Sequence, residues 1–421
     1  MTKGAQYAGC QARSSSWFKE SIAEDALKIL GKSLLIFEKL YGTKRPEITP
    51  ILLNIGITYQ FLHRYDDALM AFSRALPLYK KEYGRDHPFV AHALSLRGFS
   101  QLLAKAPTLA LEDFRRATKI LVTSTRSKNK ASWVLDEVIR HRNAFLGLIR
   151  TASFITLNSD DLNGTLEMET FDAAQWASRT SASEALSQLA ARIGSGSDAL
   201  SKLVRKRQDL VREATVQDKV LLVEITKPSD KQIKGRSDEL RNRLEVIEGR
   251  VKKIDAQLEK DFPEYADLSN PKPLSITETQ EQLRAKEALI QFMFANDEGF
   301  AWLMTKTGAK WVRLDIKLED LKRMVSTLRK GLDRSGNRAR SGQKIDVKKA
   351  TNDNSQGLKL DLKVAHKLHD ILLGQFKDEL TDIEHLMIVP DGTLQSLPPS
   401  VLVTEKPAKQ YETYRGLAKT P

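Results

Sequence analysis

The feature that most constrains the fold is a motif of small and aromatic residues that recurs after 42 residues in the first third of the chain. The two copies share all their offsets: Gly56, Ala68, Phe72 and Ala75, then Gly98, Ala110, Phe114 and Ala117. The connecting segments have the same period, since Tyr41-Gly42 recurs as Tyr83-Gly84. A fixed period of this length indicates a stack of similar helical units.

Each copy of the motif predicts two packed helices. Gly56 and Gly98 would let one helix approach the next closely, and Phe72 and Phe114 would fill the space between them. The pattern of the first copy resembles the tetratricopeptide repeat, in the longer form found in kinesin light chains: Leu52, Ile55, Gly56, Tyr59, Ala68, Phe72 and Ala75. The alternative is a plain helical bundle whose spacings coincide by chance.

Residues 12–125 are therefore expected to form tetratricopeptide repeats, of which the first is degraded. Ala26 and Leu30 occupy the positions of Ala68 and Phe72 one period earlier, so residues 12–40 would be the remnant of a repeat. The resemblance implies a superhelix whose concave face holds a peptide or another protein.

The middle of the chain is expected to be helical and to include a hairpin of two long helices. Residues 126–195 carry apolar residues at helical spacing, which indicates a further helical repeat or linker. Within residues 196–262, a seam follows steps of four and three residues: Leu240, Leu244, Ile247, Val251, Ile254 and Leu258. A weaker seam precedes it: Leu200, Leu203, Leu210, Ala214 and Leu221. The break at Lys227-Pro228-Ser229-Asp230 favours an antiparallel coiled-coil hairpin within one chain.

Strands are predicted only in the last part of the chain. Apolar runs at 288–294, 300–305 and 310–314 predict three strands, the last two forming a hairpin. The segments 318–332 and 362–376 have the pattern of amphipathic helices, and the polar segment 333–357 that of a mobile insertion. Residues 385–389 predict a buried strand, ending in a type I turn at Pro390-Asp391-Gly392. Strands alternating with helices predict an α/β sheet.

The last of these strands continues into a distinctive run: Leu386-Met387-Ile388-Val389-Pro390-Asp391-Gly392-Thr393-Leu394-Gln395-Ser396-Leu397-Pro398. Placed behind Trp302 and Trp311, this run resembles the front half of a CHAT domain, a caspase-like peptidase fold that accompanies tetratricopeptide repeats. The segment 171–177 resembles the helix that joins the two in related proteins. The resemblance implies an α + α/β fold class: a tetratricopeptide α-solenoid, a helical linker with an antiparallel coiled-coil hairpin, and a partial caspase-like α/β sheet in residues 275–421.

CHAT peptidases resemble caspases in using a histidine that activates a cysteine, which attacks the scissile carbonyl. In the family both residues lie in the half that follows the segment described above, so the resemblance implies a chain truncated before its catalytic half. The only thiol here is Cys10, and no His-Gly pair occurs. We therefore predict no catalytic residue and no cofactor, and we expect the chain to be inactive by itself.

The histidines are expected to be structural or exposed: His63, His87, His92, His141, His366, His369 and His385. His366 and His369 beside Asp370 would share a helix face, but no second segment with ligands at a suitable spacing is evident. We predict no metal site. Glycine-rich loops of the kind that hold phosphate groups are also absent from the sequence.

The charge and the cysteine content limit the partners and the compartment. The net charge of +13 comes from 67 basic and 54 acidic residues, without an aromatic stacking motif. This balance favours a solvated basic surface and no specific nucleic-acid site. No apolar run reaches the length of a membrane span. A single cysteine excludes an internal disulfide and favours a reducing, cytoplasmic location.

Three functions fit these observations. In the first, the solenoid binds a partner protein and residues 275–421 are the regulatory, non-catalytic half of a caspase-like domain. In the second, the chain is one half of a split cysteine peptidase, completed by a separate chain that supplies the C-terminal CHAT half. In the third, it is a scaffold protein without a connection to proteases.

Overall fold

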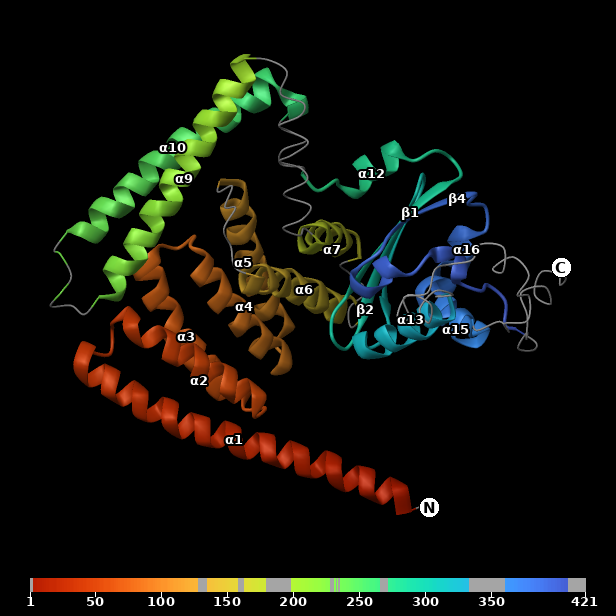
Figure 1. Ribbon diagram of the computed structural model, residues 1–421, viewed down its shortest axis with the longest axis horizontal. Coiled ribbons are helices and arrows are strands. Elements are labelled where there is room, and N and C mark those ends of the chain that lie inside the picture. The colour runs from red at the N-terminus through yellow and green to blue at the C-terminus, as the bar shows by residue number, and fades with distance from the viewer. Residues whose placement is uncertain are drawn as a thin grey trace, which may run out of the picture. The chain divides into compact units, whose positions relative to one another are not determined.

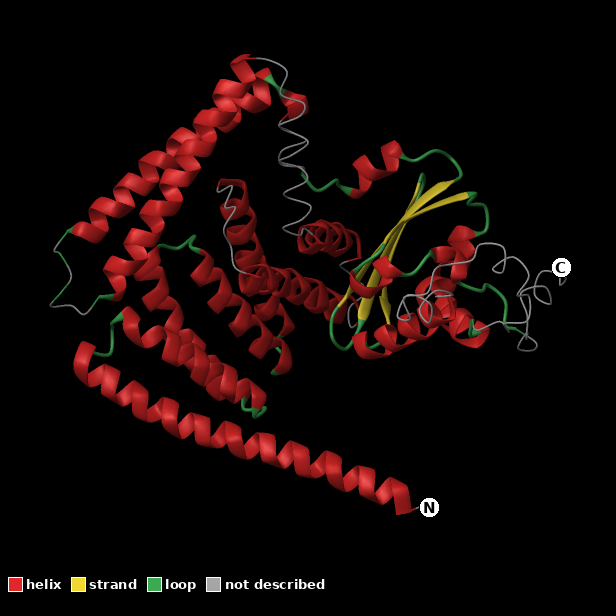
Figure 2. Cartoon of the chain, viewed as in Figure 1, coloured by secondary structure: helices red, strands yellow, loops and turns green. Residues whose placement is uncertain are grey.

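The computed structural model describes residues 3–127, 135–157, 163–178, 198–227, 231, 233, 235–265, 272–332 and 360–407. The chain divides into two compact units, Met1–Pro273 and Leu274–Pro421. We call them the helical unit and the sheet unit. Over the residues described, the helical unit is built of helices and their connections, whereas the sheet unit combines one sheet with helices (Figures 1 and 2).

The helical unit begins with helices that follow each other along a stack. Their bounds are α1 (Lys3–Tyr41), the 3-10 turn η1 (Pro46–Ile48), α2 (Thr49–Phe61), α3 (Tyr65–Tyr83), α4 (Pro88–Leu103), α5 (Pro107–Ser127), α6 (Leu135–Leu157) and α7 (Asn163–Ser178). Each helix packs against the next one: α2 against α3, α4 against α5, and α6 against α7, with α3 on α4 and α5 on α6. The stack is therefore continuous from α1 to α7.

The turns of the stack repeat with the period of the sequence. Gly42 and Gly84, which follow α1 and α3, have φ angles of 89° and 90°. His63 and Lys105, which lie between the two helices of each pair, have φ angles of 58° and 61°. The members of each pair are 42 residues apart, so both kinds of turn recur with a positive φ angle at equivalent places. The backbone thus repeats together with the side chains.

Phenylalanine rings that lie on glycines hold the helices together. A Cβ on Gly56 would lie 2.5 Å from Cε1 of Phe72, and one on Gly98 would lie 3.1 Å from Cε2 of Phe114. Both rings are fully buried. The predicted contacts are therefore confirmed.

The structure adds one contact that the period does not predict. A Cβ on Gly147 of α6 would lie 2.2 Å from Cε1 of Phe114, on the edge of the ring opposite to Gly98. Gly147 follows Gly98 by 49 residues, so it lies outside the 42-residue register. The ring of Phe114 is enclosed between two helices that each bring a glycine to it.

The first part of the stack contains one helix where the following repeats contain two, and the degraded first repeat stays a prediction. Residues 12–40 lie within the single helix α1, because no residue breaks the helix between its ends. Ala26 and Leu30 are half-buried. This region therefore contributes one helix, not a helix pair, to the stack.

Two long helices, α9 (Asp198–Thr226) and α10 (Arg236–Asp261), pack along each other (Figure 1). Five of the six predicted seam residues of α10 are buried and Leu244 is half-buried. They meet an apolar row of α9: Leu200, Val204, Leu210, Val211 and Ala214. A coiled-coil geometry of this hairpin stays a prediction.

The hairpin is attached to the repeats at the end of α3. Leu221 and Leu240 pack with Tyr83, and Arg241 donates hydrogen bonds to the backbone carbonyl of Glu82 and, at 3.1 Å, to Oε1 of its side chain. Burial raises the pKa of Tyr83 to about 12, and the charge of Glu82 adds to this effect. The phenol is therefore a half-buried, protonated group at the junction of the hairpin and the repeats.

In its described residues, the sheet unit contains four strands together with helices of different lengths. Their bounds are α12 (Ile276–Gln282), β1 (Glu287–Phe294), β2 (Gly299–Thr305), β3 (Ala309–Leu314), α13 (Leu318–Leu332), α15 (Leu362–Leu373), η2 (Gly374–Phe376), α16 (Lys377–Leu380), β4 (His385–Val389), η3 (Gly392–Ser396) and η4 (Pro399–Val401). The strand order is β3-β2-β1-β4, with β1 antiparallel to β2 and parallel to β4. The predicted β2–β3 hairpin is present, and Trp302 stacks on Trp311 across it with ring centroids 6.1 Å apart.

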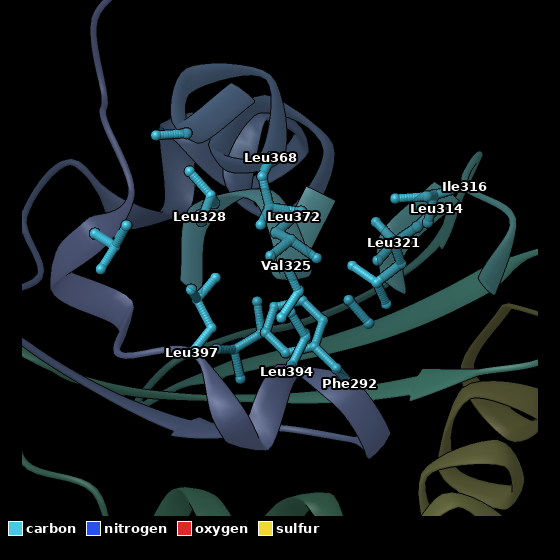
Figure 3. Packing of buried hydrophobic residues seen from close by; sticks show 14 of the residues in the cluster. Phe292, Leu314, Ile316, Leu321, Val325, Leu328, Leu368, Leu372, Leu394 and Leu397 are labelled. Carbon is cyan, nitrogen blue, oxygen red and sulfur yellow. The ribbon is translucent and has the colours of Figure 1, made fainter. Parts of the chain in front are cut away.

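One face of the sheet packs against α13 and α15 (Figure 3). Alternate residues of β1, such as Ile290 and Phe292, point to this face because side chains alternate along a strand. They meet apolar rows of the two helices: Leu321, Val325 and Leu328 of α13, and Leu368 and Leu372 of α15. The amphipathic pattern predicted for both helices thus gives the core of this unit.

Two predictions for the end of the sheet unit are wrong. The strand at 385–389 is not buried: His385, Met387 and Val389 are exposed, because β4 lies at the edge of the sheet. The turn after it is not of type I, since Asp391 is extended with φ −112° and ψ 142°. Its carboxylate accepts a hydrogen bond from the backbone N–H of Phe294 at 2.8 Å, which holds the extended conformation. The predicted insertion at 333–357 lies outside the described residues.

Replacing Gly147 with alanine should destabilise the protein, because the new methyl group would overlap the ring of Phe114. We expect the free energy of unfolding in urea to fall by about 1 to 3 kcal/mol. Gly56→Ala should lower the free energy of unfolding by a similar amount. Gly98→Ala should lower it less, because its Cβ would lie farther from the ring. Gly31→Ala in α1 is the control, since nothing lies within 4 Å of its Cβ. Equal stability of Gly147→Ala and wild type would contradict this packing.

The raised pKa of Tyr83 should make stability depend on pH. The unfolded chain releases the phenolic proton near pH 10, whereas the folded protein keeps it up to about pH 12. The free energy of unfolding should therefore fall with rising pH in this window, by up to about 1.4 kcal/mol per pH unit for one proton. Tyr83→Phe removes this contribution and leaves the lysine titrations in place. Parallel pH profiles of urea unfolding for the two proteins would contradict the prediction.

Candidate functional site

The first helices of the two complete repeats lie side by side. Gln60 of α2 donates hydrogen bonds to the carbonyl oxygen of Leu96 at 2.9 Å and to Oγ of Ser100 at 2.8 Å, both on α4. This side chain ties the helices together, so equivalent positions of α2 and α4 lie next to each other. A surface that runs across both helices is the result.

Apolar residues follow this surface at equivalent positions. On α2, Ile57 and Phe61 are one turn apart and exposed. The residues 42 positions later on α4 are Phe99, which is half-buried, and Leu103, which is exposed. Together with the half-buried Leu96 they form what we call the apolar column: Ile57, Phe61, Leu96, Phe99 and Leu103. Exposed apolar residues are common singly, but a contiguous group marks an interaction surface.

The core below fixes the orientation of the apolar column. The ring of Phe99 meets that of Phe114 edge to face, with centroids 4.9 Å apart. Arg97 holds Asp113 of α5 through two hydrogen bonds of 2.7 Å, and the carboxylate is almost fully buried. This pair raises the pKa of Arg97 above its ordinary value. A buried fork of this kind keeps α4 from rotating about its axis.

The second helices present a different surface. The exposed residues of α3 and α5 include six basic ones: Arg74, Lys80, Lys81, Arg115, Arg116 and Lys119. Three of these arginines form ion pairs inside the helical unit, Arg74 with Glu38, Arg116 with Asp86 and Arg115 with Glu169.

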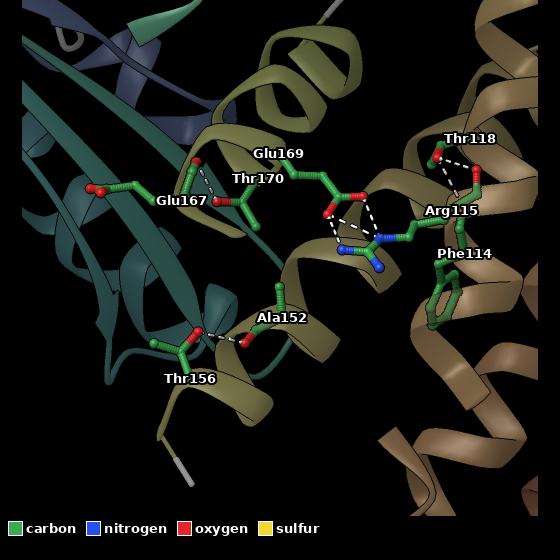
Figure 4. A network of polar contacts seen from close by, with 8 residues as sticks. All are labelled: Phe114, Arg115, Thr118, Ala152, Thr156, Glu167, Glu169 and Thr170. Atoms are coloured by element: carbon green, nitrogen blue, oxygen red, sulfur yellow. Dashed lines mark hydrogen bonds and ion pairs between the residues drawn. The ribbon is translucent and has the colours of Figure 1, made fainter. Parts of the chain in front are cut away.

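Figure 4 shows the guanidinium of Arg115 facing the carboxylate of Glu169, which joins α5 to α7. The three hydrogen bonds of this pair are 2.7 to 3.1 Å long, and they raise the pKa of Arg115. Much of the basic character of this side is therefore used for contacts within the stack.

The sheet unit offers a second surface at β4. The N–H of His385 donates to the carbonyl oxygen of Lys286 at 3.2 Å, so the backbone groups of alternate residues from His385 onward face β1. The N–H and C=O groups of Leu386 and Ile388 consequently face away from the sheet. Within residues 272–332 and 360–407, no strand pairs with this side. An unpaired edge of this kind can accept another strand.

An apolar cavity of about 390 Å³ lies beside this edge. Its walls come from the sheet, α15 and the turns after β4, and they comprise Phe292, Leu372, Leu373, Ile388, Pro390, Leu394, Gln395, Ser396, Leu397, Pro398, Pro399 and Leu402. The hydrogen bond from Phe294 to Asp391 positions the segment that forms one of these walls. The cavity is large enough for apolar side chains of a bound peptide.

The histidines considered as metal ligands do come together. Nε2 of His366 lies 3.4 Å from Oδ2 of Asp370, and Nδ1 of His369 lies 3.6 Å from Oδ1. Nδ1 of His366 is 3.2 Å from the carbonyl oxygen of Val403. All three ligand groups come from α15, and no fourth joins them in the described part of the chain. Structural zinc sites are closed by four ligands, so the absence of a metal stays our prediction.

The column residues were not singled out by the sequence analysis, which used the glycine, alanine and phenylalanine positions of the core. The signal was present, because Ile57 and Phe99 are 42 residues apart, as are Phe61 and Leu103. Outward-facing apolar residues that keep the period of the core are thus the pattern to search for.

Comparison with known protein families gives a match to the tetratricopeptide repeat, over residues 23–81 and 47–121. The helical unit therefore contains tetratricopeptide repeats, and the apolar column is part of them. A search of curated proteins gave no match. No helix in the described ranges combines the length and the apolar character that crossing a bilayer requires.

Proposed function

We propose that the chain is a protein-recognition module that binds a peptide segment of a partner across α2 and α4. The apolar column carries this proposal, because it keeps exposed apolar side chains at equivalent positions of neighbouring repeats. Solenoids of this kind use such extended concave surfaces for binding. The bound segment would carry apolar residues spaced to contact Phe61 and Leu103.

Two observations favour this surface over the outer faces of α3 and α5. Those faces carry basic residues, several of them already paired within the stack. The apolar column, by contrast, exposes apolar side chains to water in the free protein. Binding a partner that covers them would gain about 25 cal/mol of free energy for each Å² of apolar area removed from water. A few such residues usually supply most of the affinity of a peptide site.

Selection of binders from a displayed peptide library, followed by calorimetry with a synthetic peptide, tests the proposal. We expect Phe61→Glu and Leu103→Glu each to weaken binding at least about tenfold, because they place a charge at the contact. Met70→Glu is the matched control, since Met70 is 65% exposed on α3, away from the column. Affinities that change equally in all three variants, or in none, would rule out the column.

A second function is proposed for the sheet unit, on the strength of the CHAT resemblance. The β4 edge would accept a strand from a complementary caspase-like half, supplied by a partner, and the chain would contribute the regulatory side of that domain. The outward-facing groups of Leu386 and Ile388 and the apolar cavity beside them support this. The one cysteine, Cys10, lies in α1, far along the sequence from this unit. A scaffold without a protease connection remains the alternative.

Hydrogen exchange measured by NMR tests whether this edge is open. The amides of Leu386 and Ile388 should exchange much faster than those of Ile290 and Phe292 in the neighbouring strand, because their N–H groups have no partner in the sheet. Equal protection of both pairs in the free chain would contradict an accepting edge. Peptidase activity of the purified chain, with thiol-inhibitor labelling that disappears in Cys10→Ala, would argue against a purely regulatory role.

A further inference from the structure

The helix α1 carries two adjacent apolar stripes. The inner stripe is buried or half-buried, as α1 packs on α2 and η1: Ala23, Leu27, Leu30, Leu34, Phe37 and Tyr41. The outer stripe, which we call the outer seam, comprises Ile22, Ala26, Ile29, Ser33, Ile36 and Leu40. Its three isoleucines and its leucine are 54% to 67% exposed. Figure 1 shows α1 at the margin of the helical unit, beside α2.

The spacing of the outer seam is that of a coiled coil. Its residues alternate steps of four and three, which gives the 3.5-residue period of a helix that packs lengthwise on another helix. Exposed apolar side chains are common singly, whereas a contiguous group of them marks an interaction surface. Four aliphatic side chains in one line at this place are therefore a surface that a second helix would cover.

We propose that the outer seam pairs with the outer seam of a second copy of this chain, with the two α1 helices antiparallel. A two-fold axis near residue 31 would set Ile22 opposite Leu40, Ala26 opposite Ile36 and Ile29 opposite Ser33. Two of these layers join a large side chain to a small one, which fills space evenly. A parallel pair would instead stack isoleucines at the d positions, an arrangement that does not favour two strands.

Charge and hydrogen bonding agree with the antiparallel arrangement. Asp25 of one helix would face Lys39 of the other, and the symmetry makes this contact twice. The same symmetry brings Lys32 of the two helices together, which is unfavourable. The pair would therefore gain two attractive charge contacts and one repulsive contact. The hydroxyl of Ser33 already donates to the carbonyl oxygen of Ile29 at 3.0 Å, so it enters the seam without an unpaired donor.

Sedimentation velocity of the full chain over a range of concentrations, from about 1 to about 100 μM, tests the pairing. We expect the mass to double with rising concentration. Ile29→Glu should raise the dimer dissociation constant about a hundredfold or more, because the dimer would bury the new charge twice. Leu35→Glu is the control, on the same helix, 59% exposed and outside both stripes. It should leave the dimer intact.

A chain that stays monomeric over the whole range would overturn the proposal, as would equal dissociation by Ile29→Glu and Leu35→Glu. Circular dichroism confirms that each variant keeps its helices. Cross-linking tests the direction: in a Cys10→Ser background, Ile22→Cys and Leu40→Cys chains are mixed and oxidised. The antiparallel pair predicts the mixed disulfide between the two chains. Disulfides formed only between two copies of the same variant, Ile22→Cys with Ile22→Cys or Leu40→Cys with Leu40→Cys, would show a parallel pair.

Discussion

The stack depends on one contact, the ring of Phe114 between Gly98 and Gly147. Because each glycine lacks a side chain, α4 and α6 can both approach α5, and a single ring fills the space that is left. The equivalent ring of Phe72 on Gly56 sets the distance of α2 from α3, and the hydrogen bonds of Gln60 join α2 to α4. The apolar column exists because the core repeats, so recognition in this protein rests on the packing that keeps its helices at a constant distance.

The same stack also carries the other long element of the helical unit. The α9–α10 hairpin buries its seam by itself, and it meets the repeats through Tyr83 and Glu82 at the end of α3. The sequence period determines where α3 ends, since Tyr83-Gly84 is the second copy of the connecting segment Tyr41-Gly42. A connecting position in one repeat has thus become the attachment point of the hairpin, because aromatic and acidic groups there offer both apolar area and an acceptor for Arg241.

Local pattern predicted much of this structure, and long-range contacts explain where it failed. The period predicted the contacts of Gly56 and Gly98, but Gly147 lies 49 residues after Gly98, so no repeat register could include it. The apolar run at 385–389 has the composition of a central strand, yet the sheet order places it at an edge, which no local signal encodes. The turn at Asp391 was misjudged because its carboxylate bonds to Phe294, nearly a hundred residues earlier.

The enclosure of Phe114 also has a dynamic consequence. A half-turn of an aromatic ring about its own axis sweeps out more volume than the ring fills at rest, and here helix backbones occupy both edges. The ring can turn over only when α4 and α6 move apart together. The rate of ring rotation therefore reports how often the whole stack opens, and not how fast one side chain moves. Slow rotation would give separate resonances for the two sides of the ring, and binding that stiffens the repeats would slow it further.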